Sequence, residues 1–265
     1  MKIFNFGKRL SAAASGMVLA LGMASASAAP SFQINPSALG LGGPTGPVTV
    51  DAMSGTSTQL LHTIGNTHEA AGHLSYSGFV LNGSNVAANF TGLNFNYGIY
   101  LTFTLKDLTT TGVINEANSI NTLTELNFEM FADPGNSNVF HQATLTSEAS
   151  IDGTANDIKL ATGSLMDGTS SFNNLLGAAL NANTTFSLTD NGKLFFVDPV
   201  PFFDLMFNAF NNTSQSPVFG ENGLVAIASS GISDFNERQV PEPGTLALLA
   251  LGLLSVYAVK RHQQI

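Results

Sequence analysis

The stretch from Leu93 to Lys106 constrains the fold more than any other part of the chain, because its apolar residues recur at every second position. These residues are Leu93, Phe95, Tyr97, Ile99, Leu101, Phe103 and Leu105. A period of two predicts a β-strand with one buried face and one solvated face. Gly98 interrupts the pattern, and a glycine inside a strand indicates a bulge or a close backbone approach.

Similar alternation predicts two further strands, at Leu74 to Val80 and at Leu126 to Met130. The second of these is followed by Asp133 to Asn136 (DPGN), a combination that is typical of a turn. We therefore expect a hairpin whose return strand runs from Val139 to Ile151.

The second half of the body predicts shorter strands. They are expected at Ile158 to Ser164, Thr184 to Leu188, Leu194 to Val197 and Leu224 to Ala228. Asn191-Gly192 separates the second from the third, and this dipeptide can adopt the positive φ angles of a two-residue hairpin turn. A second hairpin is therefore expected there.

Two segments are open between helix and strand. The apolar residues Phe203, Met206, Phe207 and Phe210 fit one stripe of a short helix, and they fit a buried strand as well. Ser170 to Leu180 is similarly ambiguous. Short strands separated by polar turns predict an all-β fold, an antiparallel β-sandwich-like secreted domain.

This domain is expected to occupy residues 29–239, which is long enough for one domain with a sizeable core. Glycine and proline are frequent in residues 35–47, so residues 29–50 are expected to form a flexible entry segment. Residues 229–239 are expected to be a tether to the C-terminal tail.

The N-terminus has the three parts of a secretory signal peptide. Lys2, Lys8 and Arg9 precede a short apolar stretch, which ends at small residues. We expect residues 1–28 to be the signal peptide, with cleavage between Ala28 and Ala29. A retained N-terminal anchor is the weaker alternative, because the apolar stretch is short and diluted by glycine and serine.

The C-terminal tail, residues 240–265, reads VPEPGTLALLALGLLSVYAVKRHQQI. Gly244 to Val259 would form a single transmembrane helix of about 24 Å, a little shorter than the hydrocarbon core of about 30 Å. Lys260 and Arg261 follow it as a positive stop on the cytoplasmic side. The outer side then holds the turn formed by Pro241, Glu242 and Pro243. A plain membrane anchor is one reading of this tail.

The order of a Pro-Glu-Pro turn, an apolar helix and a basic end resembles the PEP-CTERM sorting signal of Gram-negative bacteria. The resemblance implies that the tail holds the protein in the inner membrane until an exosortase processes it near the Pro-Glu-Pro motif. The body would then move to the cell surface or the extracellular matrix. The resemblance covers the tail alone, so it implies a destination rather than an activity.

A second resemblance covers most of the body. It is carried by YGIYLTF at Tyr97 to Phe103, FSLT at Phe186 to Thr189, GKLFF at Gly192 to Phe196, and PVPFF at Pro199 to Phe203. These segments are similar to the flocculation-associated PEP-CTERM proteins of floc-forming bacteria. The resemblance implies a surface protein that holds cells together in exopolysaccharide flocs, with neither catalytic residues nor a cofactor.

Charge and composition narrow the classes of partner. The formal net charge is −9, and the basic residues of the body are Lys106, Lys159, Lys193 and Arg238. An acidic body repels phosphates, so no nucleic-acid partner is expected. The chain has no cysteine, which excludes zinc-thiolate sites and cysteine nucleophiles.

The histidines invite a comparison with the zinc-protease helix, whose two histidines are four residues apart. His68 and His73 are five residues apart and would leave the shared helix face. We therefore expect no zinc site. His62, His68, Glu69 and His73 could still gather around an adventitious metal, but solvated polar residues are the expected outcome.

No catalytic residue is expected either. The chain lacks the Gly-x-Ser-x-Gly pentapeptide of many serine hydrolases. Glu125 and Glu129 would lie about 13 Å apart on one face of a strand, too far for a glycosidase pair. Asp152 to Asp157 lacks the glycine position and the distal glutamate of an EF-hand loop, which leaves weak calcium binding open.

Three hypotheses for function remain. The first is a non-catalytic surface protein, sorted by an exosortase, that acts in floc or biofilm formation by associating cells with exopolysaccharide. The second is a secreted polysaccharide-binding module, although the body has no tryptophan and only Tyr76, Tyr97 and Tyr100 as candidate platforms. Rows of Asn and Thr could bind sugars weakly, and multivalent display would strengthen that binding. The third is a secreted hydrolase.

Overall fold

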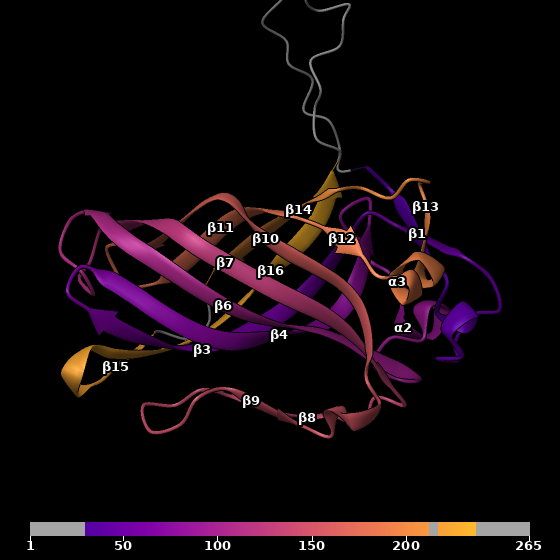
Figure 1. Cartoon of the computed structure of the whole chain (residues 1–265), viewed down its shortest axis with the longest axis horizontal. Helices are drawn as coiled ribbons and strands as arrows, with labels where there is room; N and C mark the ends of the chain where they lie inside the picture. The colour runs from indigo at the N-terminus through magenta and orange to yellow at the C-terminus, as the bar shows by residue number, and fades with distance from the viewer. Residues whose placement is uncertain (1–29, 212–216, 237–265) are drawn as a thin grey trace, which may run out of the picture.

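The protein, described by a computed structural model over residues 30–211 and 217–236, is built mostly of strands that pair in antiparallel fashion. Eight strands follow one another both in the chain and in space (Figure 1). They are β3 (Ala52–Ile64), β4 (Thr67–Leu81), β6 (Tyr97–Thr111), β7 (Ser119–Pro134), β10 (Ile158–Phe172), β11 (Ala178–Thr185), β14 (Leu205–Asn211) and β16 (Leu224–Asn236).

This sheet closes on itself, because β11 pairs with β14 on one side and with β10 on the other. Each of the eight strands therefore has a hydrogen-bonded neighbour on both sides, which protects its backbone from pairing with another chain. We call this ring the closed sheet. The predicted all-β, antiparallel, sandwich-like fold is confirmed.

The alternation in the sequence separates the inside of the closed sheet from its outside. Leu101 and Leu105 of β6 point inward and are almost completely buried. Between them, Phe103 lies opposite Gly72 of β4 and Phe128 of β7, and Phe128 lies opposite Gly163 of β10. A Cβ atom on Gly163 would come within 2.3 Å of the Phe128 ring. Glycine at this position therefore gives the inward-facing ring its space.

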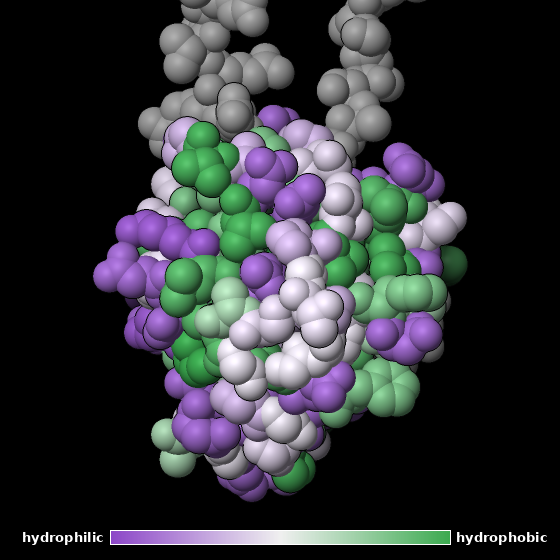
Figure 2. Space-filling view, turned by 90° about the vertical axis from the view of Figure 1, so that its right-hand side faces the viewer, coloured by the Kyte–Doolittle hydropathy of each residue, from purple (hydrophilic) through white to green (hydrophobic). Residues whose placement is uncertain are grey.

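One end of the closed sheet is filled by a small second sheet and its neighbours. β1 (Phe32–Ile34) pairs with both β2 (Val48–Val50) and β13 (Phe196–Asp198). The helical turns η1 (Pro36–Leu39), α2 (Ala88–Thr91) and α3 (Asp190–Phe195) lie at the same end (Figure 1). Figure 2 looks onto this end, where apolar and polar side chains are interspersed on the surface.

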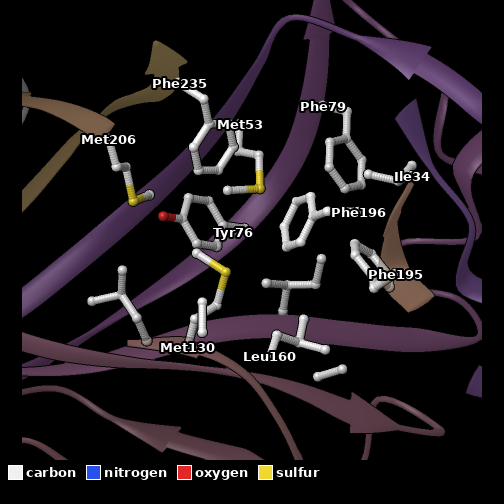
Figure 3. Packing of buried hydrophobic residues seen from close by; sticks show 14 of the residues in the cluster. Ile34, Met53, Tyr76, Phe79, Met130, Leu160, Phe195, Phe196, Met206 and Phe235 are labelled. Atoms are coloured by element: carbon white, nitrogen blue, oxygen red, sulfur yellow. The ribbon is translucent and has the colours of Figure 1, made fainter. Parts of the chain in front are cut away.

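Aromatic rings pack among methionine, leucine and isoleucine side chains in the core at this end (Figure 3). Phe196 of β13 lies 5.0 Å from Phe202 and 5.7 Å from Phe235 of β16, measured between ring centroids. Phe32 of β1 packs edge-on against Phe235 at 5.0 Å. The expectation of a flexible entry segment at residues 29–50 was therefore wrong over β1 and β2, because Phe32 and Val50 are fully buried in this core.

The remaining short elements lie outside the ring or extend it. They are β5 (Ser84–Asn85), β12 (Ser187–Leu188), β15 (Val218–Phe219) and η3 (Glu221–Gly223). A separate two-stranded arm, residues 137–157, contains β8 (Val139–His141), β9 (Ser150–Asp152) and η2 (Thr154–Asn156). The arm runs along the outside of the closed sheet (Figure 1).

The predicted hairpin after Asp133 was wrong in its return strand. The chain does turn at Gly135, but the strand that pairs with β7 is β10, which begins at Ile158. The segment from Val139 to Ile151 forms the arm instead, because its two short strands pair with each other.

The hairpin predicted at Asn191-Gly192 was also wrong. The hydroxyl of Thr189 accepts a hydrogen bond from the Gly192 amide at 3.0 Å, which caps the start of α3. The open alternative at Phe203 to Phe210 is resolved in favour of a strand, β14, in which Met206 and Phe210 point inward.

The tether predicted at residues 229–239 was wrong up to Asn236. Ser229 to Asn236 continue β16, which pairs with β3 and β14 along this stretch. Phe235 lies on the inner face of this strand and is fully buried.

Several sequence predictions lie outside the described residues. These are the signal peptide with its cleavage between Ala28 and Ala29, the motif Pro241, Glu242 and Pro243, the helix from 244 to 259, and the stop at Lys260 and Arg261. Within residues 30–211 and 217–236, no helix has the length and apolar character needed to cross a membrane.

Candidate functional site

The outer face of β4, β6, β7 and β10 carries two ranks of mostly polar side chains. Strand register aligns His73, Thr102, Glu129 and Thr162 in one rank. The neighbouring rank contains Ala71, Thr104, Asn127 and Ser164. The period of two that buries leucine and phenylalanine inside therefore presents hydroxyl and amide groups outside.

The arm turns this face into a groove. Ala149, Ser150, Ile151 and Thr154 of the arm face the ranked side chains across an open, mixed polar and apolar space of about 940 Å³. Thr185 and Ser187 extend the groove beyond β10. A groove of this kind can accept an extended polar ligand along the outside of the sheet.

Aromatic and hydrogen-bond contacts fasten the arm to the closed sheet. Phe140 of the arm packs 5.5 Å from Tyr100 and 5.3 Å from His73, between ring centroids. The Ala143 amide donates to the Thr58 hydroxyl at 2.9 Å. On the far side of Phe140, a smaller hollow of about 260 Å³ opens over β3 and β16.

His73 lies under the arm at the junction of the two hollows. Its Nε2 lies 3.1 Å from the His141 carbonyl oxygen, so this nitrogen donates. Burial lowers the pKa of His73 below its usual 6.5, although the hydrogen bond to His141 opposes the shift. A neutral imidazole results, and its buried Nδ1 has no hydrogen-bond partner among the described residues.

His68 lies on the other side of the same strand, inside the closed sheet, and is completely buried. Its Nδ1 lies 2.7 Å from an Asp107 oxygen and its Nε2 lies 2.9 Å from the Asn115 side-chain oxygen. Because both nitrogens face oxygen atoms, these contacts favour the protonated ring, an imidazolium that donates from both nitrogens. Burial disfavours that charge, but Asp107 and Asn115 outweigh it and raise the pKa of His68 above 6.5.

The polar chain continues from Asp107 across the interior. Ser170 donates to the second Asp107 oxygen at 2.5 Å, and Asn121 donates to Ser170 at 2.9 Å. Asp107 therefore lies between the serine and the histidine, which is not the order that a histidine base needs to activate a serine. We call the group of His68, Asp107, Asn115, Asn121 and Ser170 the polar cluster.

His68 and His73 are close in sequence but lie on opposite faces of β4. Side chains alternate along a strand, so a spacing of five residues puts His68 inside the closed sheet and His73 outside it. His62 lies 2.6 Å from Glu148 of the arm, and Glu69 pairs with Lys106 at 3.0 Å. In the part of the chain that the structure describes, no three His, Cys, Asp or Glu side chains are grouped to hold a metal.

The paired glutamates each have a separate partner. Glu129 accepts from Lys159 at 2.7 Å, and Glu125 accepts from Asn127 at 3.0 Å. In the candidate calcium segment, Asp152 lies 3.0 Å from His141, while Asp157 accepts from Tyr100 and Asn138. Tyr76 and Tyr97 are fully buried and Tyr100 nearly so, and none forms an exposed platform.

Sequence reasoning missed the polar cluster and the arm. The signal for Asp107 was present, because Asp107 lies two residues after Leu105 and continues the inward positions of Leu101 and Leu105. A carboxylate at an inward position indicates a buried partner. The arm had no comparable signal, because its strands are three residues long.

Comparison with known proteins adds information on the tail. Residues 239–261 match the family described as PEP-CTERM protein-sorting motif. No curated protein and no solved structure matches the chain. The match includes the Pro-Glu-Pro tripeptide, the apolar residues after it and the basic residues on which the sequence prediction rested. The chain therefore carries a PEP-CTERM protein-sorting motif, which indicates export and exosortase-dependent sorting to the cell surface.

Proposed function

We propose that this protein is a non-catalytic component of the cell surface or extracellular matrix that associates cells with exopolysaccharide in flocs or biofilms. The groove between the arm and the outer face of the closed sheet is the proposed contact with the glycan. This groove is the observation that carries the proposal, because it is open and its polar lining consists largely of hydroxyl groups.

The chemistry of the groove favours a neutral, hydroxyl-rich chain. Thr102, Thr104, Asn127, Thr162 and Ser164 each offer a short polar group on a rigid strand. Hydroxyls and amides can both donate and accept, as sugar hydroxyls do. Such contacts are individually weak, and many copies on one cell would add their affinities through multivalency.

Two features of the groove support a role without catalysis. Glu129, the carboxylate that lines the groove, is engaged by the Lys159 ammonium. His73 lies in the same rank but is held under Phe140 with its Nε2 committed to the His141 carbonyl. Neither group has the free, paired geometry that glycoside hydrolysis requires.

A retention assay on the exopolysaccharide of the producing cells tests the proposal. The full chain is purified in detergent, and the variant Thr104→Val/Thr162→Val removes two groove hydroxyls while keeping the β-branched shape. The double variant Thr110→Val/Thr124→Val is the matched control, since these threonines lie on β6 and β7 but do not line the groove.

We expect the wild type and the control to be retained and the groove variant to lose most of its retention. If the wild-type protein shortens the polymer during the assay and is therefore not retained, it would instead be a secreted hydrolase. No retention of the wild type would contradict the proposal. Deletion of the gene is expected to disperse flocs while exopolysaccharide persists.

A further inference from the structure

The base of the arm brings together oxygen atoms from three segments of the chain. Asp133 ends the buried part of β7 and accepts hydrogen bonds from the Asn138 amide at 2.9 Å and the Ser137 hydroxyl at 3.3 Å. Asn138 in turn donates its side-chain Nδ2 to Asp157 Oδ2 at 2.8 Å. The point where the arm leaves β7 and the point where it returns to β10 are therefore in contact.

Two of the oxygens at this base receive no hydrogen bond from the described residues. The Oδ1 atoms of Asn138 and Asp157 are both buried, and each lacks a partner there. Leaving a buried acceptor unsatisfied costs the full desolvation of that group. Since two such atoms belong to side chains that touch each other, a shared ligand that offers positive charge would satisfy both.

The charge balance points the same way. Asp133 is completely buried, and neither it nor Asp157 forms an ion pair within the described part of the chain. Tyr100 donates to Asp157. The described residues therefore place two carboxylates here without a counterion, and buried charges of this kind are normally paired or bound to metal.

The turn at Gly153 lies close to the same oxygen atoms. Gly153 has a φ of +93°, and a Cβ atom there would lie 3.1 Å from the orphaned oxygen of Asn138. Glycine therefore lets the turn after β9 approach this oxygen closely. The donor set is made of carboxylate and amide oxygens, with the Ser137 backbone carbonyl close to Gly153, which is the chemistry of calcium rather than of zinc or copper.

We propose that a calcium ion binds at the base of the arm through Asn138 Oδ1 and Asp157 Oδ1, with Asp133 supplying further negative charge. Backbone carbonyls and water complete its coordination, as is usual for calcium in proteins. The ion joins the two ends of the arm and so holds one wall of the groove. The proposal does not depend on glycan binding.

Calcium titration of the full chain in detergent tests the site. Terbium replaces calcium as a luminescent probe, excited through tyrosine, because the chain has no tryptophan and Tyr100 contacts Asp157. We expect terbium emission that calcium displaces, and an unfolding temperature that rises with calcium. An affinity of about 10⁻⁴ to 10⁻³ M is expected, as in other extracellular calcium modules.

The structure supplies a matched pair of variants in one loop. Asp157→Asn removes a proposed ligand charge and is expected to weaken calcium binding at least tenfold. Asp152→Asn changes an exposed carboxylate that bonds His141, and it is expected to leave the affinity within twofold. Asn138→Ala, which keeps the charge count, provides a second test and is expected to weaken binding as Asp157→Asn does.

Two results would overturn the proposal. One is a wild-type chain whose unfolding temperature and terbium emission do not respond to millimolar calcium. The other is an Asp152→Asn variant that loses as much affinity as Asp157→Asn. Either result would leave the glycan retention assay unaffected.

Discussion

The two ends of the closed-sheet interior have different chemistry. At the end that carries β1 and β13, Phe32, Phe196 and Phe235 fill the space with aromatic rings. At the opposite end, His68 and Asp107 form a buried ion pair inside a network of hydrogen bonds. The interior of one closed sheet is thus filled in two ways. The aromatic end should tolerate substitutions that keep the size of the side chain. The polar end should tolerate only substitutions that keep its hydrogen-bonding capacity.

The largest effect is expected at the aromatic end. Phe196→Ala removes a ring that contacts five other phenylalanines and should lower the free energy of unfolding by about 4 kcal/mol. Urea unfolding followed by circular dichroism measures the change. Phe90→Ala is the control, because Phe90 is 64% exposed and should cost less than about 0.5 kcal/mol. Equal effects would show that the aromatic end is not a packed core.

The next largest effect is expected in the polar cluster. Asp107→Ala leaves the His68 imidazolium buried without its counterion and should cost about 3 kcal/mol. Asp167→Ala is the control, because Asp167 is exposed and accepts a single bond from Asn183. The same urea experiment measures both variants. A stable Asp107→Ala protein would mean that His68 is neutral in the fold.

The pH dependence of stability should distinguish His68 from His73. The pKa of His68 is raised in the fold, so its contribution is complete below 6.5 and is lost as the pH rises through the folded value. The pKa of His73 is lowered, so its contribution is present above 6.5 and is lost as the pH falls through the folded value. Unfolding temperatures measured from about pH 5 to about pH 9 report both.

Single substitutions separate the two histidines. His68→Gln should remove the loss of stability on the alkaline side, and His73→Gln should remove the loss on the acid side. A His68→Gln protein that keeps the alkaline slope of the wild type would refute the ion pair as its cause.

The smallest effect is expected midway between the two ends. Ser57 and Ser229 share a hydrogen bond of 2.7 Å there, beside an internal cavity of about 50 Å³. Ser57→Ala removes one neutral hydrogen bond next to space that can hold water, and should cost about 0.5 to 1 kcal/mol. A loss as large as that of Asp107→Ala would show that Ser57 contributes more than this one neutral hydrogen bond.

Much of the closed sheet could be predicted from local pattern. The alternation around Leu101 and Leu105 identified β6 and its buried face, and Leu126 to Met130 identified β7. Phe95 was an error, because it belongs to the turn before β6 and is 72% exposed. Alternation alone does not show where pairing begins, so the boundary of the strand could not be predicted.

The partners of the strands were harder to predict than the strands themselves. A turn at Gly135 is compatible with an immediate return strand, but β7 pairs with a strand that begins after the arm. At Asn191-Gly192, local turn chemistry favoured a hairpin, whereas the Thr189 cap and the tight approach of Gly192 to the Leu160 carbonyl favour α3. These are tertiary contacts, which no local pattern contains.

The candidate sites also differ in whether they depend on local sequence or on contacts between distant segments. The tail was predicted because its three parts are contiguous in sequence, and residues 239–261 match the sorting motif. The groove and the base of the arm were not, because they join residues from separate segments. Asp157 was noticed within the Asp152 to Asp157 loop, but its partner Asn138 lies across the arm and has no sequence signal.

The pairing of β16 with β3 has a consequence for the timing of folding during export. These strands are the last and the first of the ring, and their hydrogen-bonded residues Ser57 and Ser229 are 172 positions apart. A chain that emerges from its N-terminal side cannot complete the ring until β16 has emerged, and contacts of such separation form slowly. The sorting motif begins three residues after the end of β16. The ring can therefore close only after nearly all of the chain that precedes the motif has emerged.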